Sequence, residues 1–459
     1  MAPSLTDVVV VVPGIMGSVL HRHGKPVWDS SVGAVGHGVF SGLRSIRDLA
    51  LPEGIGDEAP DDDVEAVGLI RGIRLSLGLW TFDVGYGSLF DRLRESFEVS
   101  DGTQGPANLV EFPYDWRLSN RHNGARLKLV AERALDEWRA QGGACADAEL
   151  VFLCHSMGGL VARWYVDHLG GHDVTRKVIT LGTPHRGALN ALDQLVNGVR
   201  KGIGPFKADL TALGRSMPSL HQMLPEYACI EGPERLAKVG EVGLPGLASG
   251  MVDDAVRFHA ELAAAREVSA QGYDLHPIVG FQQPTFTTAR IEGGRAVGGL
   301  TIKGVDEGGD ATVPRLSATP ADLAPDHVSV HSVADRHGAL PSNAGILDLI
   351  EGILTARSIV HRGGQEAISV DLDEVVEVGE PLVVRAVPVE REIPLEAVVS
   401  DLDGRRAGGP VRLHPDGTPV PLLGPGGYQV KIRGAGPRGA LIAPVTSIVT
   451  VWPTDLPDP

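Results

Sequence analysis

A short apolar run, a sharp turn around one serine and a helix follow one another in residues 150–171, and this succession constrains the fold most strongly. Residues 151–153 are apolar and indicate a buried strand. The predicted helix has apolar side chains at helical spacing and a glycine pair suited to end it: Leu160, Val161, Trp164 and Leu169, then Gly170 and Gly171. We therefore predict a strand–turn–helix unit with Ser156 at its turn.

The turn matches the G-x-S-x-G pattern of a nucleophile elbow, except that Cys154 stands at the first glycine position. Such an elbow needs a tight turn, so that the serine hydroxyl stands clear of the sheet. Its first and last positions must be small because strand and helix approach closely, and Cys154 and Gly158 both meet this requirement. The alternative is an ordinary strand–turn–helix junction, which the motifs described below disfavour.

Composition and charge narrow the class of protein. With 459 residues, 43% hydrophobic and 22% charged, the chain has the size for two or three domains and the composition of a soluble globular protein. Its net charge of -17 argues against general electrostatic binding of nucleic acid or of an anionic membrane surface. Three cysteines predict no disulfide framework. We expect a cytoplasmic protein without a signal peptide, transmembrane segment, metal or cofactor.

Strands and helices alternate along the first three quarters of the chain. Residues 8–12 are five consecutive valines, which is typical of a strand covered on both faces. Further elements are predicted as strands at 109–112, 150–154, 177–181, 276–281 and 328–333, and as helices at 86–97, 127–138 and 344–356. This alternation predicts the α/β class, with a mostly parallel sheet and helices on both faces.

We predict two domains. Residues 1–360 form the α/β domain, with a glycine-rich insertion at about 29–80 interpreted as a lid and a helix-prone insertion at about 188–275 interpreted as a cap. Residues 363–459 contain about six or seven short, partly alternating strands and no predicted helix, which indicates a small all-β, Ig-like sandwich.

Ser156 is followed by an acid and a histidine near strand ends, in the order Ser156, Asp310, His337. Acyl transfer through a serine needs a base for the hydroxyl proton, a group that orients this base, and fixed donors for the oxyanion. Backbone N–H groups of the glycine-containing loop 13–18, which follows the first strand, are candidates for these donors.

Other acids and histidines are weaker candidates. His327 precedes the last predicted strand of the α/β domain and His331 lies within it, so neither falls at its carboxyl end. Asp306 lacks the sequence context of Asp310, and Asp335 is too near His337 to orient it easily.

Five segments of the chain resemble the lecithin:cholesterol acyltransferase family of α/β-hydrolases. They are residues 13–18, 113–118, the elbow at 155–159, 182–184 and 309–314, and the resemblance covers most of residues 8–355. It implies an α/β-hydrolase fold with Ser156 as nucleophile, Asp310 as orienting acid and His337 as general base. It also implies an oxyanion hole formed by the backbone N–H groups of Met16 and Met157.

The resemblance also implies action on ester-linked acyl groups of lipids. Two positions depart from the family pattern: Cys154 in the elbow, and Ala311 where Gly-Asp-Gly is usual in the acid loop. No secretory signal or lid disulfide is evident, and the C-terminal sandwich lies outside the resemblance. Trp28, Tyr114 and Trp116 are candidates for an acyl pocket, although aromatic residues at strand ends more often belong to the core.

The predicted function is that of a serine esterase, lipase or O-acyltransferase that forms an acyl-serine intermediate on a small-molecule or lipid acyl ester. Two alternatives stay open. The chain could be a catalytically weak adaptor that binds protein partners through its C-terminal β domain, or an amidase or thioesterase with the same triad. For His185, which follows a predicted strand, a structural hydrogen bond is the favoured role.

Overall fold

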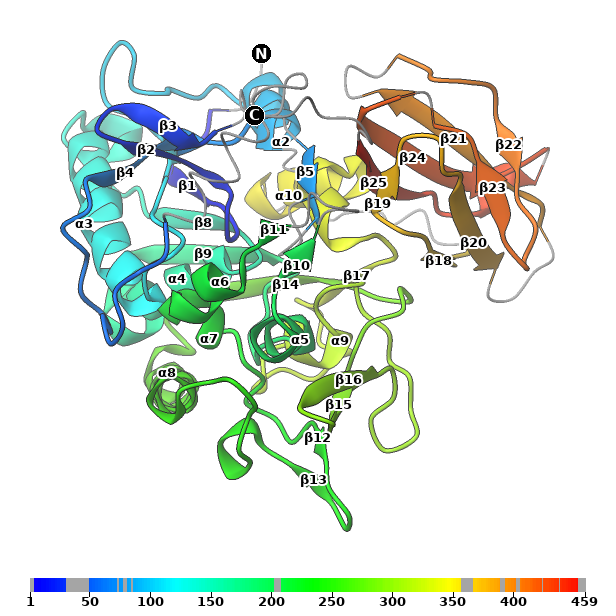
Figure 1. Ribbon diagram of the computed structural model, residues 1–459. Coiled ribbons are helices and arrows are strands. Elements are labelled where there is room, and N and C mark those ends of the chain that lie inside the picture. Colours follow the sequence, from blue (N-terminus) through cyan, green and yellow to red (C-terminus); the bar gives the residue numbers. More distant parts are fainter. Residues whose placement is uncertain are drawn as a thin grey trace.

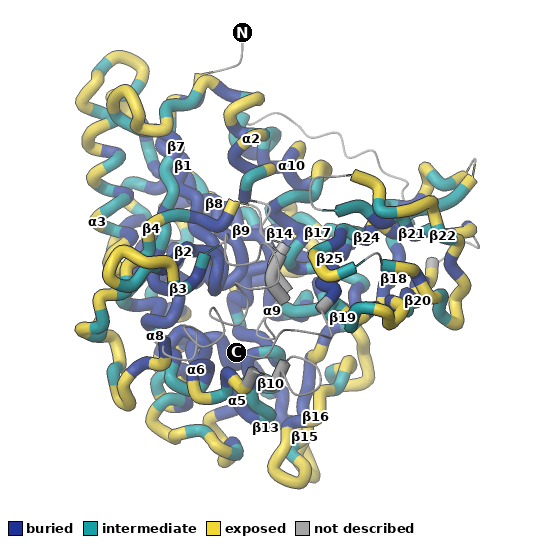
Figure 2. Tube along the Cα trace, turned by 45° about the horizontal axis from the view of Figure 1, so that its top comes forward, coloured by how far each residue is buried: buried dark blue, intermediate teal, exposed yellow. Residues whose placement is uncertain are grey.

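The five valines of β1 (Val8–Val12) lie inside a six-stranded sheet, and all five are buried. The strand order is β17-β14-β9-β8-β1-β7, and every pairing in this sheet is parallel. The other strands are β7 (Leu109–Glu111), β8 (Leu150–His155), β9 (Thr175–Leu181), β14 (Asp274–Gly280) and β17 (His331–Val333). The predicted parallel α/β sheet is therefore confirmed, and Figure 2 shows its central strands as buried.

The structure is a computed structural model that describes residues 4–29, 49–71, 74–76, 81–83, 86–201, 208–355, 366–388, 393–401, 405–422, 424–436 and 438–452. None of the described helices combines the length and apolar character needed to cross a membrane.

Helices connect and cover the sheet strands (Figure 1). They are α2 (Tyr86–Ser96), α3 (Asn120–Arg139), α4 (Gly158–Arg163) and α10 (Ala344–Thr355). α3 packs against α4 and β1, whereas α2 packs against α10. α3 begins earlier than its apolar periodicity indicated, because Ser119 caps it by accepting a hydrogen bond from the His122 N–H.

The helix after the serine turn is shorter than predicted in its regular form. α4 ends at Arg163, and a π-helical segment, η3 (Trp164–His168), continues it. Gly170 then adopts a left-handed conformation, with φ 83°, which suits the predicted glycine stop. The apolar spacing thus predicted the helical segment but not its change of pitch.

The last strand of the α/β region is also shorter than predicted. Residues 328–330 alternate in polarity but do not join β17, and Val328 is 87% exposed. The backbone N–H of Ser329 donates to the His327 ring, and the Val330 N–H donates to the His327 carbonyl, so these residues form a local turn. The strand is confirmed only over its last three residues.

The two predicted insertions contain small elements of their own. In the first, β4 (Val64–Leu69) pairs with β2 (Ser18–Arg22), which precedes the insertion and also pairs with β3 (Lys25–Trp28). At the end of this insertion β5 (Arg74–Ser76) pairs with β6 (Thr81–Asp83). A large part of the predicted lid at 29–80 lies outside the described residues.

The segment predicted as a cap is mainly helical. It contains α5 (Leu189–Asn197), β10 (Arg200–Lys201), β11 (Ala208–Asp209), α6 (Thr211–Ser216), α7 (Pro218–His221), β12 (Ile230–Glu231), β13 (Leu236–Ala237) and α8 (Ser249–Ser269). Between β14 and β17 follow the hairpin of β15 (Thr288–Glu292) and β16 (Arg295–Gly299) and the short helix α9 (Arg315–Ala318). The roles of lid and cap stay predictions.

The C-terminal strands form a separate β-domain, shown in orange to red in Figure 1. One sheet has the order β18-β20-β23 and the other the order β19-β25-β24-β21-β22, and the two share a core of their own. The strands are β18 (Ile368–Asp371), β19 (Val375–Glu377), β20 (Leu382–Pro388), β21 (Leu395–Asp401), β22 (Val411–Arg412), β23 (Thr418–Val420), β24 (Gly426–Gly434) and β25 (Val445–Trp452). The predicted all-β character is confirmed, and the Ig-like classification stays a prediction.

Candidate active site

Ser156 lies at the turn between β8 and α4, and its φ of 52° is a left-handed conformation that is uncommon for a residue with a side chain. The Ser156 N–H donates to the Leu181 carbonyl at 2.9 Å, and the Thr183 hydroxyl donates to the Ser156 carbonyl at 2.9 Å. Both bonds come from β9 and the turn that follows it. The neighbouring strand therefore holds the strained turn, as expected for a nucleophile elbow.

The small residues around this turn are required by close packing. A Cβ at Gly158 would lie 2.4 Å from the Pro13 carbonyl oxygen, and one at Gly159 would lie 2.2 Å from the Thr183 hydroxyl. Cys154 is fully buried in β8, and burial raises the pKa of its thiol far above the ordinary value, so the thiol stays neutral. A cysteine is thus accommodated at this elbow position as a small apolar residue.

The structure brings Ser156, His337 and Asp310 into one hydrogen-bonded series. His337 Nε2 lies 2.9 Å from Ser156 Oγ, and His337 Nδ1 lies 2.7 Å from Asp310 Oδ2. When Nδ1–H donates to the carboxylate, Nε2 is the ring nitrogen that accepts the serine proton. All three residues are buried, and Ser156 is only 2% exposed.

Asp310 is held by the backbone of its own loop. Its Oδ1 accepts hydrogen bonds from the N–H groups of Thr312 at 3.0 Å and Val313 at 2.7 Å, which leaves Oδ2 for the histidine. Ala311 adopts φ 73°, in the left-handed region that favours glycine. The departure of this loop from Gly-Asp-Gly therefore places a strained alanine beside the acid.

Two glycines at strand ends make room for the acid and the histidine. A Cβ at Gly182, which has φ 57°, would lie 2.7 Å from Asp310 Oδ2 and 2.9 Å from His337 Nδ1. A Cβ at Gly280 would lie 2.3 Å from the Asp310 Cβ. These spacing roles were not predicted from the sequence, where the available signal was a glycine at or directly after the end of a predicted strand.

The loop after β1 places backbone donors beside Ser156. A Cβ at Gly14 would lie 3.0 Å from the Ser156 Cβ, and Met16 has φ 61°. Among the hydrogen bonds of the described residues, none is donated by the backbone N–H of Met16 or Met157. The absence of a protein acceptor is compatible with the predicted oxyanion hole, and this role of Met16 and Met157 stays a prediction.

The three aromatic residues predicted as acyl-pocket candidates are buried around this loop. The Trp28 indole N–H donates to the Met16 carbonyl at 2.7 Å, and the Tyr114 hydroxyl donates to the Pro13 carbonyl at 2.8 Å. Trp116 packs edge-on against Trp28, with 5.9 Å between the ring centroids. These contacts fix the loop carbonyls, and contact with a substrate stays a prediction.

Tyr86 and His155 connect the loop after β1 to His337, a link that sequence reasoning missed. The Gly14 N–H donates to the Tyr86 hydroxyl at 2.8 Å, this hydroxyl lies 2.9 Å from His155 Nδ1, and His155 Nε2 lies 3.2 Å from the His337 carbonyl. Burial, aided by the nearby His337, lowers the pKa of His155 to about 3, so the ring is neutral. Its Nε2–H donates to the carbonyl and its Nδ1 accepts from Tyr86. The position of His155 within the elbow was the only available signal.

The competing acids and histidines have other partners. His327 is bonded to Ser329, the ring of His331 stacks on that of His276, and Asp306 accepts from the Gly308 N–H. Asp335 accepts hydrogen bonds from Arg336, Asn343 and Thr446. His337, which contacts Ser156, and Asp310, which contacts His337, are the histidine and the acid predicted from chain order, and their catalytic roles stay predictions.

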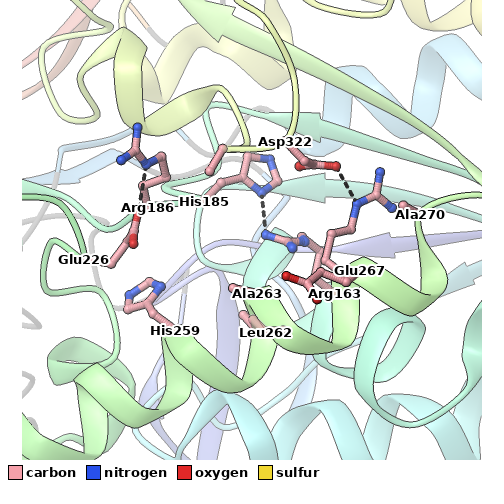
Figure 3. Close-up of a pocket in the computed structure, with 12 residues that line it drawn as sticks. Arg163, His185, Arg186, Glu226, His259, Leu262, Ala263, Glu267, Ala270 and Asp322 are labelled. Carbon is pink, nitrogen blue, oxygen red and sulfur yellow. Dashed lines mark hydrogen bonds and ion pairs between the residues drawn. The ribbon is translucent and has the colours of Figure 1, made fainter.

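His185 lies in a separate cavity of about 320 Å³, drawn in Figure 3, whose lining contains no residue of the proposed triad. Its Nε2 lies 3.1 Å from the Thr180 hydroxyl and its Nδ1 lies 3.4 Å from Arg163 Nη1. Burial, with the charges of Arg163 and Arg266, holds the pKa of His185 well below its usual range. The contacts are those of a structural, neutral histidine.

Comparisons with known proteins find similarity to one family and to several solved structures. Residues 89–240 match the family Lecithin:cholesterol acyltransferase. No curated protein shows significant sequence similarity to the chain.

Among solved structures, the chain is similar to one in the Tle4-Tli4 complex, with 14% identity, a TM-score of 0.50, and coverage of 77% of this chain and 99% of that chain. It is also similar to the Bacillus licheniformis lipase BlEst2 in mature form, with 12% identity, a TM-score of 0.36, and coverage of 77% and 94%. The parallel sheet and this structural likeness show that the chain has an α/β-hydrolase fold, and its residues 89–240 are similar to the lecithin:cholesterol acyltransferase family.

Proposed function

We propose that the protein is a serine hydrolase or O-acyltransferase that acts on ester-linked acyl groups of lipid-like substrates. The observation that carries the proposal is the hydrogen-bonded series from Ser156 Oγ through the His337 ring to Asp310 at a left-handed elbow. The match to an acyltransferase family supports an acyl ester as the substrate class. In this proposal residues 1–360 form the catalytic domain, with lid and cap at about 29–80 and 188–275, and residues 363–459 form the β-domain.

The proposed reaction has two halves. Ser156 Oγ attacks the ester carbonyl while His337 Nε2 takes its proton, and the N–H groups of Met16 and Met157 receive the charge on the carbonyl oxygen. His337 then donates this proton to the departing alcohol, which leaves an acyl-Ser156 ester. Asp310 keeps the Nδ1 proton in place and stabilises the imidazolium during both transfers.

The second half uses the same groups. Water or an acceptor alcohol gives its proton to His337 Nε2 and attacks the acyl carbon. The tetrahedral intermediate collapses, Ser156 Oγ leaves and regains the proton, and a free acid or a new ester departs. Hydrolysis and transfer differ only in the acceptor, so the proposal includes both.

A serine-directed phosphonate probe tests the nucleophile. We expect intact mass to show one adduct on the wild-type protein, none on Ser156→Ala, and an unchanged adduct on the control Ser96→Ala. Ser96 is a partly buried serine of α2 that donates to Glu351, away from the triad. An adduct that survives in Ser156→Ala would remove Ser156 from the mechanism.

The acceptor and the acyl chain are tested with acyl esters of several chain lengths, with and without an added alcohol. Mass detection of the covalent acyl-enzyme, together with the released acid and any new ester, distinguishes hydrolysis from transfer. The same assay with amide and thioester donors tests the alternative chemistry. Turnover of amides or thioesters in preference to all esters would contradict the proposed substrate class.

A further inference from the structure

The β-domain contacts the chain directly before His337. The guanidinium of Arg336 donates to Glu374 Oε1 from Nη2 at 2.6 Å and from Nε at 3.2 Å. Its Nη1 donates to the Val370 carbonyl of β18 at 3.2 Å. The Arg336 side chain is 11% exposed, so this paired contact is largely shielded from water, which strengthens it relative to a surface ion pair.

Asp335, the residue before Arg336, makes a second contact with the β-domain. Its buried carboxylate accepts hydrogen bonds from the backbone N–H of Thr446 in β25 at 3.1 Å and from that of Arg336 at 2.8 Å. The other oxygen accepts from the Asn343 side chain at 2.7 Å. A buried carboxylate is costly unless it is hydrogen-bonded, so Asp335 ties the backbone before His337 to β25.

A third contact reaches the acid. Gln283 is fully buried, its amide nitrogen donates to the Ile368 carbonyl at 3.1 Å, and its amide oxygen accepts from the Val370 N–H at 3.2 Å. The Gln283 backbone exchanges two hydrogen bonds of 3.1 Å with Gly309, the residue before Asp310. The His337 N–H in turn donates to the Asp310 carbonyl at 2.8 Å, which joins the two loops.

The β-domain therefore touches both loops that carry the acid and the base. Glu374, which lies between β18 and β19, is itself anchored, because its carbonyl accepts from the Thr450 N–H of β25 at 2.8 Å. Figure 1 shows β19 and β25 on the side of the β-domain that faces α10 and β17. β25 also contacts η7 (His337–Ser342), the 3-10 helix that begins at the histidine.

We propose that the β-domain positions the general base, with Arg336 and Glu374 as positioning residues. This proposal rests on the function proposed above. A general base works only within hydrogen-bond reach of its proton donor, and a displacement of about 1 Å can cost up to about 10²-fold in rate. The loops after β14 and β17 obtain that precision from hydrogen bonds to a domain that follows them in the sequence.

The full-length Glu374→Ala variant tests the ion pair. Because the Asp335 and Gln283 contacts remain, we expect kcat and the rate of phosphonate labelling to fall by about ten-fold, with KM unchanged. Arg336→Lys keeps the charge but loses the two guanidinium donors to Glu374 Oε1, so its kcat and labelling rate are expected to lie between those of wild type and Glu374→Ala. Hydrogen exchange of residues 331–343 is expected to be faster in Glu374→Ala.

The matched control is Glu396→Ala. Glu396 pairs with Arg433 inside the β-domain at 2.8 Å, an ion pair of similar geometry that joins β21 to β24. This variant is expected to keep the wild-type kcat, labelling rate and exchange of residues 331–343. If Glu374→Ala matches wild type in kcat, labelling rate and exchange, or if Glu396→Ala changes all three to the same extent as Glu374→Ala, the positioning proposal is wrong.

Failure of the proposed function has a different signature. A wild-type protein that neither labels nor turns over esters contradicts the serine mechanism, whatever the variants do. The exchange measurement still decides the positioning claim in that case, because unchanged exchange at residues 331–343 in Glu374→Ala shows that the ion pair does not hold this loop.

Discussion

The two halves of the candidate site are stabilised in different ways. The nucleophile half, Ser156 with the loop after β1, is built from neighbouring central strands, and its tight contacts come from residues adjacent in sequence to those strands. The acid–base half, Asp310 and His337, lies on the loops after β14 and β17, at the edge of the sheet that β17 forms. Its loops are bonded to β18, β25 and Glu374.

One site can therefore combine a part that is fixed by local packing with a part whose position depends on contacts to another domain. An elbow held by the adjacent central strand β9 and the turn after it needs small residues at the positions of close approach. A base presented by a loop needs partners from elsewhere, and here the β-domain supplies several of them. Variants in the two halves should therefore fail differently: the first through local collisions, the second through loss of alignment between loops.

The largest effect should come from removing the negative charge behind the base. Asp310→Asn keeps the size of the side chain but favours the wrong tautomer of His337, and we expect kcat to fall by about 10⁴-fold. Asp306→Asn changes an exposed acid nearby in sequence and should leave kcat unchanged. Steady-state kinetics on the two variants make the comparison, and equal effects would show that Asp310 is not the orienting acid.

The next effect should come from closing the space between the acid and the base. Gly182→Ala would place a Cβ 2.7 Å from Asp310 Oδ2, so we expect kcat to fall by about 10²-fold through displacement of the reacting groups. Gly24→Ala is the matched control, because Gly24 has φ 72° and a Cβ added there would have no neighbour within 4 Å. A similar loss of activity in both variants would attribute the effect to backbone strain instead of the collision.

The nucleophile half was predicted from sequence more completely than the acid–base half. Short continuous sequence patterns contain Ser156, its glycines and the valine strand. These patterns reflect local steric constraints, so the geometry follows from residues that are near in the sequence. Asp310 and His337 could be chosen from chain order, but their support by Arg336, Gln283 and Glu374 depends on long-range packing. The shortening of β17 and the π-helical segment after Arg163 also depend on tertiary contacts that periodicity does not encode.

Acid should weaken the fold through neutral buried histidines. Burial lowers the pKa of His155 to about 3 and that of His259 to about 4, whereas the ordinary value is 6.5. The unfolded chain therefore binds more protons below pH 6.5, so stability is full above this pH and falls as the pH decreases. Each histidine contributes a loss of about 1.4 kcal/mol per pH unit in this window.

Urea unfolding at about pH 7.0, roughly half a unit above the ordinary histidine pKa, and at about pH 5.5, about one unit below it, measures this dependence. His155→Gln should show a smaller difference between the two pH values, because it removes one of the contributing groups. Equal unfolding free energies of the wild-type protein at both pH values would show that the buried rings are not neutral in the folded state.

The smallest effect should come from relieving strain beside the acid. Ala311→Gly places glycine at φ 73° and should raise the unfolding free energy by up to about 1 kcal/mol, the gain from relieved strain exceeding the entropy lost. Ala134→Gly in α3 should act in the opposite sense, with a loss of about 0.5–1 kcal/mol, because its backbone is helical. Thermal unfolding of both variants tests the contrast, and destabilisation by Ala311→Gly would be inconsistent with a strained loop.

Peptide mapping of the phosphonate adduct tests the central claim most directly. Trypsin cleavage after Arg139 and Arg163 yields a peptide, residues 140–163, in which Ser156 is the only serine. The claim that the two halves form one reaction centre predicts a single adduct on this peptide, formed rapidly in the wild-type protein and far more slowly in Asp310→Asn. An adduct on any other peptide, or equal labelling rates in both proteins, would contradict it.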